Sequence, residues 1–200
     1  MAAGLLLLLV FCGGFSIMSI ELLGGRILAP YFGSSIYVWG SLITVFMLAL
    51  SIGYLLGGRF SLNNPSVTRF GALFLVAAAA VMPLLLVGNQ LMDFVFEYIE
   101  DPRYGSLAAS MMLFFLPTIA LGMISPYAVR LLVEHREHSG HIAGKLYFVS
   151  TIGSALGTLL TSFYLVLHFE VNQILIAVVA ALILCGLIAL GSDQRTRATA

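Results

Sequence analysis

Six apolar runs, each of about 18–22 residues, dominate the sequence and limit the folds open to it. A helix needs roughly 20 apolar residues to cross about 30 Å of hydrocarbon, so each run predicts a transmembrane helix. Strands of a membrane barrel would instead alternate over about ten residues. We therefore predict an all-α integral membrane protein, with a transmembrane domain over residues 1–191 and a cytoplasmic tail over 192–200. The expected spans are residues 5–23, 38–56, 70–87, 107–124, 146–167 and 171–190.

The composition supports the same class of protein. Hydrophobic residues make up 60% of the 200 residues and charged residues only 9%. Soluble domains carry about 25% charged residues, so this chain has too few to cover a water-facing surface. An ordinary soluble enzyme, a nucleic-acid binder and a disordered protein are thereby excluded.

The position of the charges predicts how the chain lies in the membrane. Seven of the nine basic residues fall on the side that holds both termini, whereas Arg26 and Arg103 fall on the other. Because positive charge stays on the cytoplasmic side, both termini are expected in the cytoplasm, in a bacterial inner membrane. The seven are Arg59, Arg69, Arg130, Arg136, Lys145, Arg195 and Arg197. The opposite side is acidic, with Asp93, Glu97, Glu100, Asp101 and Glu170.

Glu21 is the only acid inside the six apolar runs. A charge at that depth costs several kcal/mol unless it is paired or faces water. Glu21 is therefore either a cation or proton site, or a structural partner for Arg26 or for hydroxyls of a neighbouring helix. The five-residue spacing to Arg26 is poor for a pair within one helix.

The segment after Glu21 combines glycines, Pro30 and aromatic residues. Pro30 and the glycines at 24 and 25 are expected to stop the first helix. The aromatic residues that follow suggest either an interfacial belt or a wall around an organic cation. They are Tyr31, Phe32, Tyr37 and Trp39.

Small and hydroxyl-bearing residues gather in the second and fifth spans. Gly53 with Gly57, and Gly153 with Gly157, have the four-residue spacing that lets helices approach closely. The fifth span adds a polar face, which indicates tight helix packing or the lining of a polar pathway. Its hydroxyl residues include Ser150, Ser154, Thr158 and Thr161.

Two further patterns predict local structure. Pro83, Pro117 and Pro126 are expected to break or kink the third and fourth helices. Residues 89–101 read as a short amphipathic helix on the outer interface, with an acidic stripe that is either a solvated face or a collector of cations.

Motifs for catalysis or metal binding are missing from the sequence. His135, His138 and His141 have ligand-like spacing, but no cysteine or carboxylate completes a zinc site. Cys12 and Cys185 are distant in sequence and read as apolar packing residues. We expect no metal, no cofactor, no nucleic-acid partner and no enzymatic activity in this chain.

Several segments resemble the membrane domain fused to spermidine-synthase-like proteins. They are ELLGGRILAPYFG at 21–33, YVWG at 37–40, GYLLGGR at 53–59 and GHIAGKLYFVSTIGSALGT at 140–158. The resemblance implies half of a major-facilitator-like bundle, with three plus three helices, and a link to polyamine chemistry. The fused proteins continue into an aminopropyltransferase-like domain, whose catalytic residues have no counterpart in these 200 residues.

Two functions follow as hypotheses. The first is a transporter, or half of one working as a homodimer in the bilayer, for a polyamine or another organic cation. The second is a membrane anchor or scaffold for a separate soluble aminopropyltransferase-like enzyme or a membrane complex. The residues expected to bind the cation are Glu21, Arg26, Tyr31, Trp39, Tyr54, Tyr147, Ser150, Ser154 and Thr158.

Overall fold

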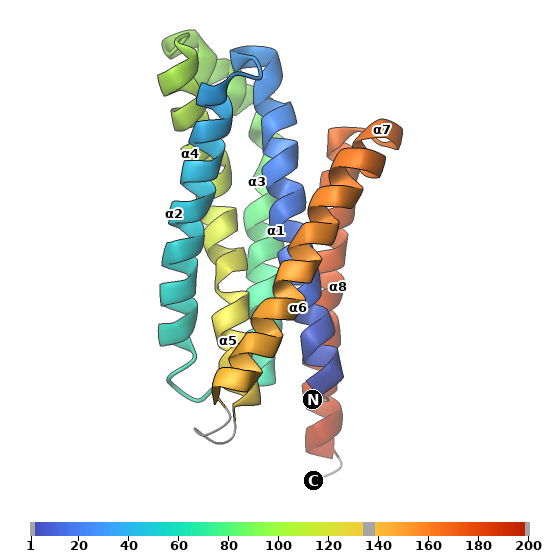
Figure 1. Cartoon of the computed structure of the whole chain (residues 1–200). Coiled ribbons are helices and arrows are strands. Elements are labelled where there is room, and N and C mark those ends of the chain that lie inside the picture. Colours follow the sequence, from blue (N-terminus) through green and yellow to red (C-terminus); the bar gives the residue numbers. More distant parts are fainter. Residues whose placement is uncertain (1–2, 134–138, 199–200) are drawn as a thin grey trace.

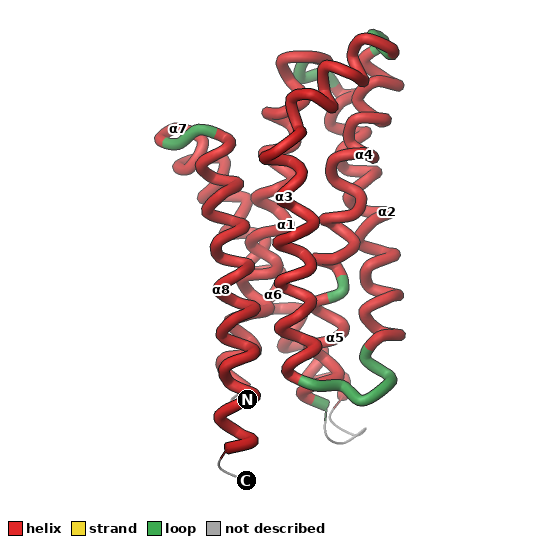
Figure 2. The backbone as a smooth tube through the Cα atoms, turned by 180° about the vertical axis from the view of Figure 1, so that it is seen from behind, coloured by secondary structure: helices red, strands yellow, loops and turns green. Residues whose placement is uncertain are grey.

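The computed structural model describes residues 3–133 and 139–198, and within them the chain is helical with short connections and no strand (Figures 1 and 2). The helices are α1 (Ala3–Phe32), α2 (Ile36–Phe60), α3 (Val67–Tyr98), α4 (Pro102–Gly122), α5 (Ile124–Leu132), α6 (Ser139–Leu160), the π-helix η2 (Thr161–Leu165), α7 (Val166–His168) and α8 (Val171–Ala198).

Six helical segments are long and apolar enough to cross a membrane, as predicted. α4 with α5 forms the fourth span, α6 with η2 and α7 forms the fifth, and α8 is the sixth. The protein is therefore a multi-pass integral membrane protein. α8 continues to Ala198, past residue 192 where a tail was predicted.

The first helix is longer than predicted, because neither the glycines nor Pro30 stops it. α1 runs through Pro30 to Phe32 and ends at Gly33, whose φ of +75° is readily adopted only by glycine. Gly25 packs against the Trp39 ring, so it serves helix packing rather than termination. As a result Glu21 lies eleven residues before the end of α1, roughly 16 Å along the helix axis.

The prolines have unequal effects on the helices. Pro83 lies inside α3 and Pro117 inside α4, and neither ends its helix. The fourth span is interrupted instead at Met123, three residues before Pro126. The Pro126 ring has no N–H to donate and crowds the carbonyl of Gly122, which accounts for the interruption.

The predicted interfacial helix over residues 89–101 is wrong as a separate element. α3 continues unbroken to Tyr98, so most of this segment forms its last turns. The acids also do not act as one stripe. Asp101 lies outside α3 and caps α4, where its side chain accepts a hydrogen bond from the backbone N–H of Arg103 at 2.9 Å.

Helix packing follows an approximate two-fold pattern. α1 packs on α6, α2 on α4 and α3 on α8. If the first, second and third spans are exchanged with the fourth, fifth and sixth, the contact of α1 with α6 becomes the contact of α4 with α2. The contact of α3 with α8 is unchanged. The pattern relates the first three spans to the last three, and Figure 1 shows the helices of the two sets interleaved in one bundle.

Glycine makes the two equivalent helix contacts close. A Cβ on Gly57 of α2 would lie 2.5 Å from the carbonyl oxygen of Met123, and one on Gly157 of α6 would lie 2.5 Å from that of Phe15. Both distances are below van der Waals contact, so only glycine fits. Gly53 and Gly153 meet the facing backbone in the same way.

The two ends of the bundle differ in charge. We define the acidic end as the one that holds the connections at 33–35, 99–101 and 169–170, with Asp93 and Glu170. The basic end holds Ala3, the connection at 61–66 and the Arg59 and Arg69 side chains. The first and last described residues both lie at the basic end (Figure 1).

Candidate functional site

A polar pocket of about 560 Å³ opens at the acidic end of the bundle. It lies between the last turns of α1, the last turns of α3 and the start of α8, where the α7 turn leans away from the other helices (Figures 1 and 2). The pocket is lined by Arg26, Ile27, Pro30, Tyr31, Asn89, Asp93, Glu170, Val171 and Asn172. We refer to it as the acidic-end pocket.

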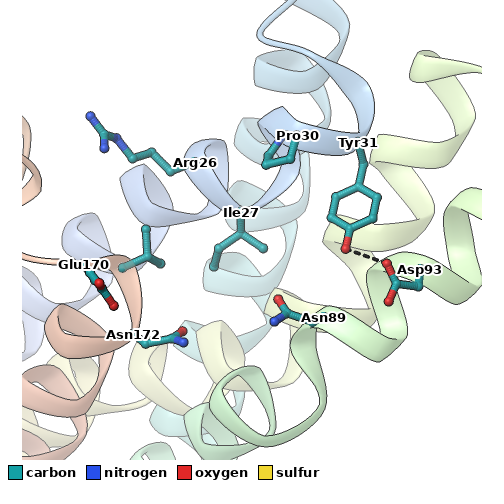
Figure 3. A pocket seen from close by; sticks show the side chains of 9 residues that line it. Arg26, Ile27, Pro30, Tyr31, Asn89, Asp93, Glu170 and Asn172 are labelled. Carbon is teal, nitrogen blue, oxygen red and sulfur yellow. Dashed lines mark hydrogen bonds between the residues drawn. The ribbon is translucent and has the colours of Figure 1, made fainter.

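Two carboxylates face each other across this pocket. Asp93 lies on α3 at one side and Glu170, just before α8, at the other, with the amides of Asn89 and Asn172 between them (Figure 3). The arrangement offers two negative charges at its edges and neutral hydrogen-bonding groups in its middle. Such a lining suits a ligand with separated positive charges.

Tyr31 holds one of the carboxylates in place. Its hydroxyl donates a 2.7 Å hydrogen bond to Oδ1 of Asp93 (Figure 3). The Tyr31 ring itself packs edge-on against Phe96, at 5.9 Å between ring centroids. Because Pro30 continues the helix rather than ending it, Tyr31 reaches this position from the last turn of α1.

Arg26 lines the pocket, but its guanidinium points away from Asp93 (Figure 3). It donates a long hydrogen bond of 3.5 Å to the carbonyl of Val166, directly after the π-helix η2. Pro30 lacks the N–H that would otherwise bond to the Arg26 carbonyl, so the Arg26 carbonyl has no i+4 donor within α1.

A second, smaller pocket of about 240 Å³ lies on the other side of Arg26. It is formed by α1, the start of α2 and η2. π-helical turns in membrane and soluble helices often occur at functional sites, and this one contributes Thr161 and Ser162. The full lining is Leu22, Gly25, Arg26, Trp39, Thr161, Ser162 and Val166. Arg26 therefore borders both pockets.

Glu21 is half-buried and, among the described residues, takes part in no hydrogen bond or ion pair. The structural alternative, a pair with Arg26, is not formed. Glu21 lines neither pocket, and it lies about one helical turn before Gly25, which lines the second pocket.

The other residues expected to bind a cation lie elsewhere. Tyr54 of α2 and Tyr147 of α6 are exposed and near one another, toward the basic end. The structure does not bring them to either pocket. The expected residues thus form two groups, one at the acidic end and one farther along α2 and α6.

The hydroxyls of α6 are engaged in hydrogen bonds to neighbouring helices or within α6 itself. Ser154 donates to the carbonyl of Gly14 on α1 at 3.2 Å, and Thr158 donates to the carbonyl of Ser154 at 3.0 Å. Ser150 and Ser125 share a longer hydroxyl contact of 3.4 Å. These bonds favour the packing interpretation of the polar α6 face over a pathway.

Sequence reasoning named Asp93 and Glu170 as charges on the acidic side but did not place them in a site. Their 77-residue separation hid the pocket, and Asn89 and Asn172 carried no signal of their own. Two members of the histidine series, His135 and His138, lie outside the described residues. Within the described part of the chain no group of three metal-ligating residues occurs.

Comparison with protein-family models, curated proteins and solved structures gives no significant match to this chain.

Proposed function

We propose that the protein binds an organic cation with separated amino groups, of the polyamine class, in the acidic-end pocket and moves it across the membrane. The observation that carries the proposal is the pair of carboxylates, Asp93 and Glu170, on opposite sides of one pocket with amides between them. The resemblance of residues 21–33 and 140–158 to membrane domains fused to spermidine-synthase-like proteins favours the same ligand class.

The charge balance of the pocket supports a cationic ligand. Asp93 and Glu170 outnumber Arg26, whose guanidinium is directed to the Val166 carbonyl instead. Each exposed carboxylate–ammonium pair contributes only about 0.2–1 kcal/mol. The contributions of two such pairs to the binding free energy of one ligand add together. Tyr31 and the amides of Asn89 and Asn172 offer further hydrogen bonds.

A route across the membrane would start from this pocket. Arg26 separates it from the second pocket, and Glu21 lies about one helical turn before Gly25 of that pocket. An unpaired carboxylate within a span is costly, and such residues commonly mark ion or proton pathways. In this scheme Glu21 takes up the cation, or a coupled proton, after Arg26 moves aside.

Binding is tested by equilibrium titration of labelled spermidine onto the purified protein in lipid nanodiscs. Asp93→Asn and Glu170→Gln should each weaken binding by up to about fivefold, or roughly 0.2–1 kcal/mol. Glu97→Gln is the matched control, because Glu97 is an exposed acid of the same α3 end that does not line the pocket. Equal losses in all three variants would show a general effect of charge and no pocket.

Transport is tested by uptake of labelled spermidine into proteoliposomes. We expect wild-type uptake and its loss in Glu21→Gln, with binding at the acidic-end pocket retained. Equal uptake in the two proteins would remove Glu21 from the mechanism. Wild-type protein that binds spermidine without taking it up would contradict transport.

A second candidate function, a membrane scaffold, is favoured by the exposure of the fifth span. Ser139–His168 is the least buried of the six, and the outer face of α6 meets no other described helix. A homodimer, or a separate aminopropyltransferase-like enzyme docked at the basic end, would use this surface. Gentle purification through a C-terminal tag would recover such a partner in fixed ratio, and protein that stays monomeric and alone would contradict the scaffold.

A further inference from the structure

The structure brings together the two cysteines of the chain, which are 173 residues apart in sequence. Cys12 lies in α1 and Cys185 in α8, and their side chains are close enough to affect each other electrostatically. Both are free thiols. Their meeting follows from the packing of the first span on the last, which the sequence pattern did not predict.

We propose that Cys12 and Cys185 form a redox-active dithiol that closes to a disulfide between α1 and α8, with a lipid-soluble quinone as oxidant. This inference is independent of cation binding, because neither residue lines the acidic-end pocket.

The chemistry balances with the quinone as the acceptor. Two S–H bonds break and one S–S bond forms between the Cys12 and Cys185 sulfurs. The two electrons and two protons that leave the thiols convert the quinone to its hydroquinone. Disulfide formation starts from a thiolate, and a nearby second thiol supplies the other sulfur of the bond.

The location of the pair determines which oxidant can reach it. Cys12 lies nine residues into α1, roughly 13 Å along the axis, inside the first apolar span. It is partly exposed, whereas Cys185 is only 6% exposed. The outer surface of a membrane-spanning helix faces lipid, so Cys12 is accessible to a molecule dissolved in the bilayer. The buried Cys185 then supplies the second sulfur of the disulfide.

An apolar recess lies on the same two helices, about two helical turns from the pair. It has a volume of about 330 Å³ and is lined by Leu5, Ile188, Gly191 and Ser192. Leu5 precedes Cys12 by seven residues and Ser192 follows Cys185 by seven, so both lie two helical turns away on the same faces. A quinone tail or ring fits the apolar character of this recess.

The test uses the full-length protein, reduced and reconstituted in liposomes, with a short-chain ubiquinone analogue as the probe. After exposure, the protein is unfolded in SDS and its free thiols are counted with a polyethylene-glycol maleimide. Wild type should fall from two labelled thiols to none, lose the mass of two hydrogens, and regain both thiols with dithiothreitol. Retention of both thiols, or a loss that dithiothreitol does not reverse, would overturn the proposal.

Two controls separate a built pair from independent oxidation. In Cys12→Ser and Cys185→Ser the one remaining thiol should stay free, because it has no partner with which to form a disulfide. Trp39 fluorescence checks that both variants are folded. Wild type unfolded in SDS beforehand should close at least about tenfold more slowly, because the fold supplies the proximity. Oxidised glutathione, a water-soluble oxidant, should also react at least about tenfold more slowly. Equal rates in either comparison would refute the assigned geometry or the assigned oxidant.

Discussion

The close contact between α1 and α6 leads to a prediction about Gly157. A Cβ at this position would lie 2.5 Å from the carbonyl oxygen of Phe15 and 3.0 Å from its Cα. Side-chain carbons do not approach closer than 3.0 Å, so Gly157→Ala must separate the two backbones by at least 0.5 Å there. Because the facing atoms are backbone, no side chain can move to relieve the contact.

The magnitude follows from a matched substitution in the same helix. Gly144 of α6 has no atom within 4 Å of its Cβ position, so Gly144→Ala adds no contact. Alanine raises helix propensity at both sites by up to about 1 kcal/mol. Overpacking affects only Gly157→Ala, at about 1–3 kcal/mol. The free energy of unfolding should therefore differ between the two variants by about 1–3 kcal/mol, with Gly157→Ala the less stable.

The measurement is SDS titration of each variant in mixed micelles, followed by fluorescence of Trp39, the single tryptophan of the chain. This residue reports folding because its ring packs on Gly25 of α1. Coincident unfolding midpoints for the two variants would refute the argument that α1 and α6 meet backbone to backbone at Gly157. A more stable Gly157→Ala would refute it as well.

Three further predictions concern single contacts. Tyr127→Phe should lower the free energy of unfolding by about 1–3 kcal/mol in the same titration, because the buried hydroxyl bonds to both the N–H and the carbonyl of Ser66. Gly33→Ala should lower the free energy of unfolding by roughly 1–2 kcal/mol, because φ at this position is +75° and alanine adopts such a backbone conformation only with strain. Asp101→Ala should lower the Tm near neutral pH. The Arg103 side chain holds the pKa of the Asp101 carboxyl below its usual range, so the contribution is present above about pH 4 and disappears as pH falls further. A Tm difference that persists unchanged to low pH would contradict the last of these.

The helices themselves could be predicted because the bilayer imposes one length and one polarity on every span. For the same reason the sequence located Glu21 as the one acid within them. Local rules failed where packing overrode them. Glycines and Pro30 are helix breakers in water, yet α1 runs through them. Gly25 packs closely on Trp39 and Gly24 on Leu42 and Phe114, and lipid leaves no alternative partner for the backbone.

The site depended on tertiary structure in a way that no local pattern carries. Asp93 and Glu170 belong to different spans, and each alone is an ordinary interfacial acid. Only the packing of α3 on α8 places them around one pocket with Tyr31. The contact of Cys12 with Cys185 arises likewise from the packing of α1 on α8. The sequence by itself determined the number of spans and the charge of each end, because these depend on local composition. Which residues meet was decided by helix packing, because pairing among six similar helices depends on contacts far apart in the chain.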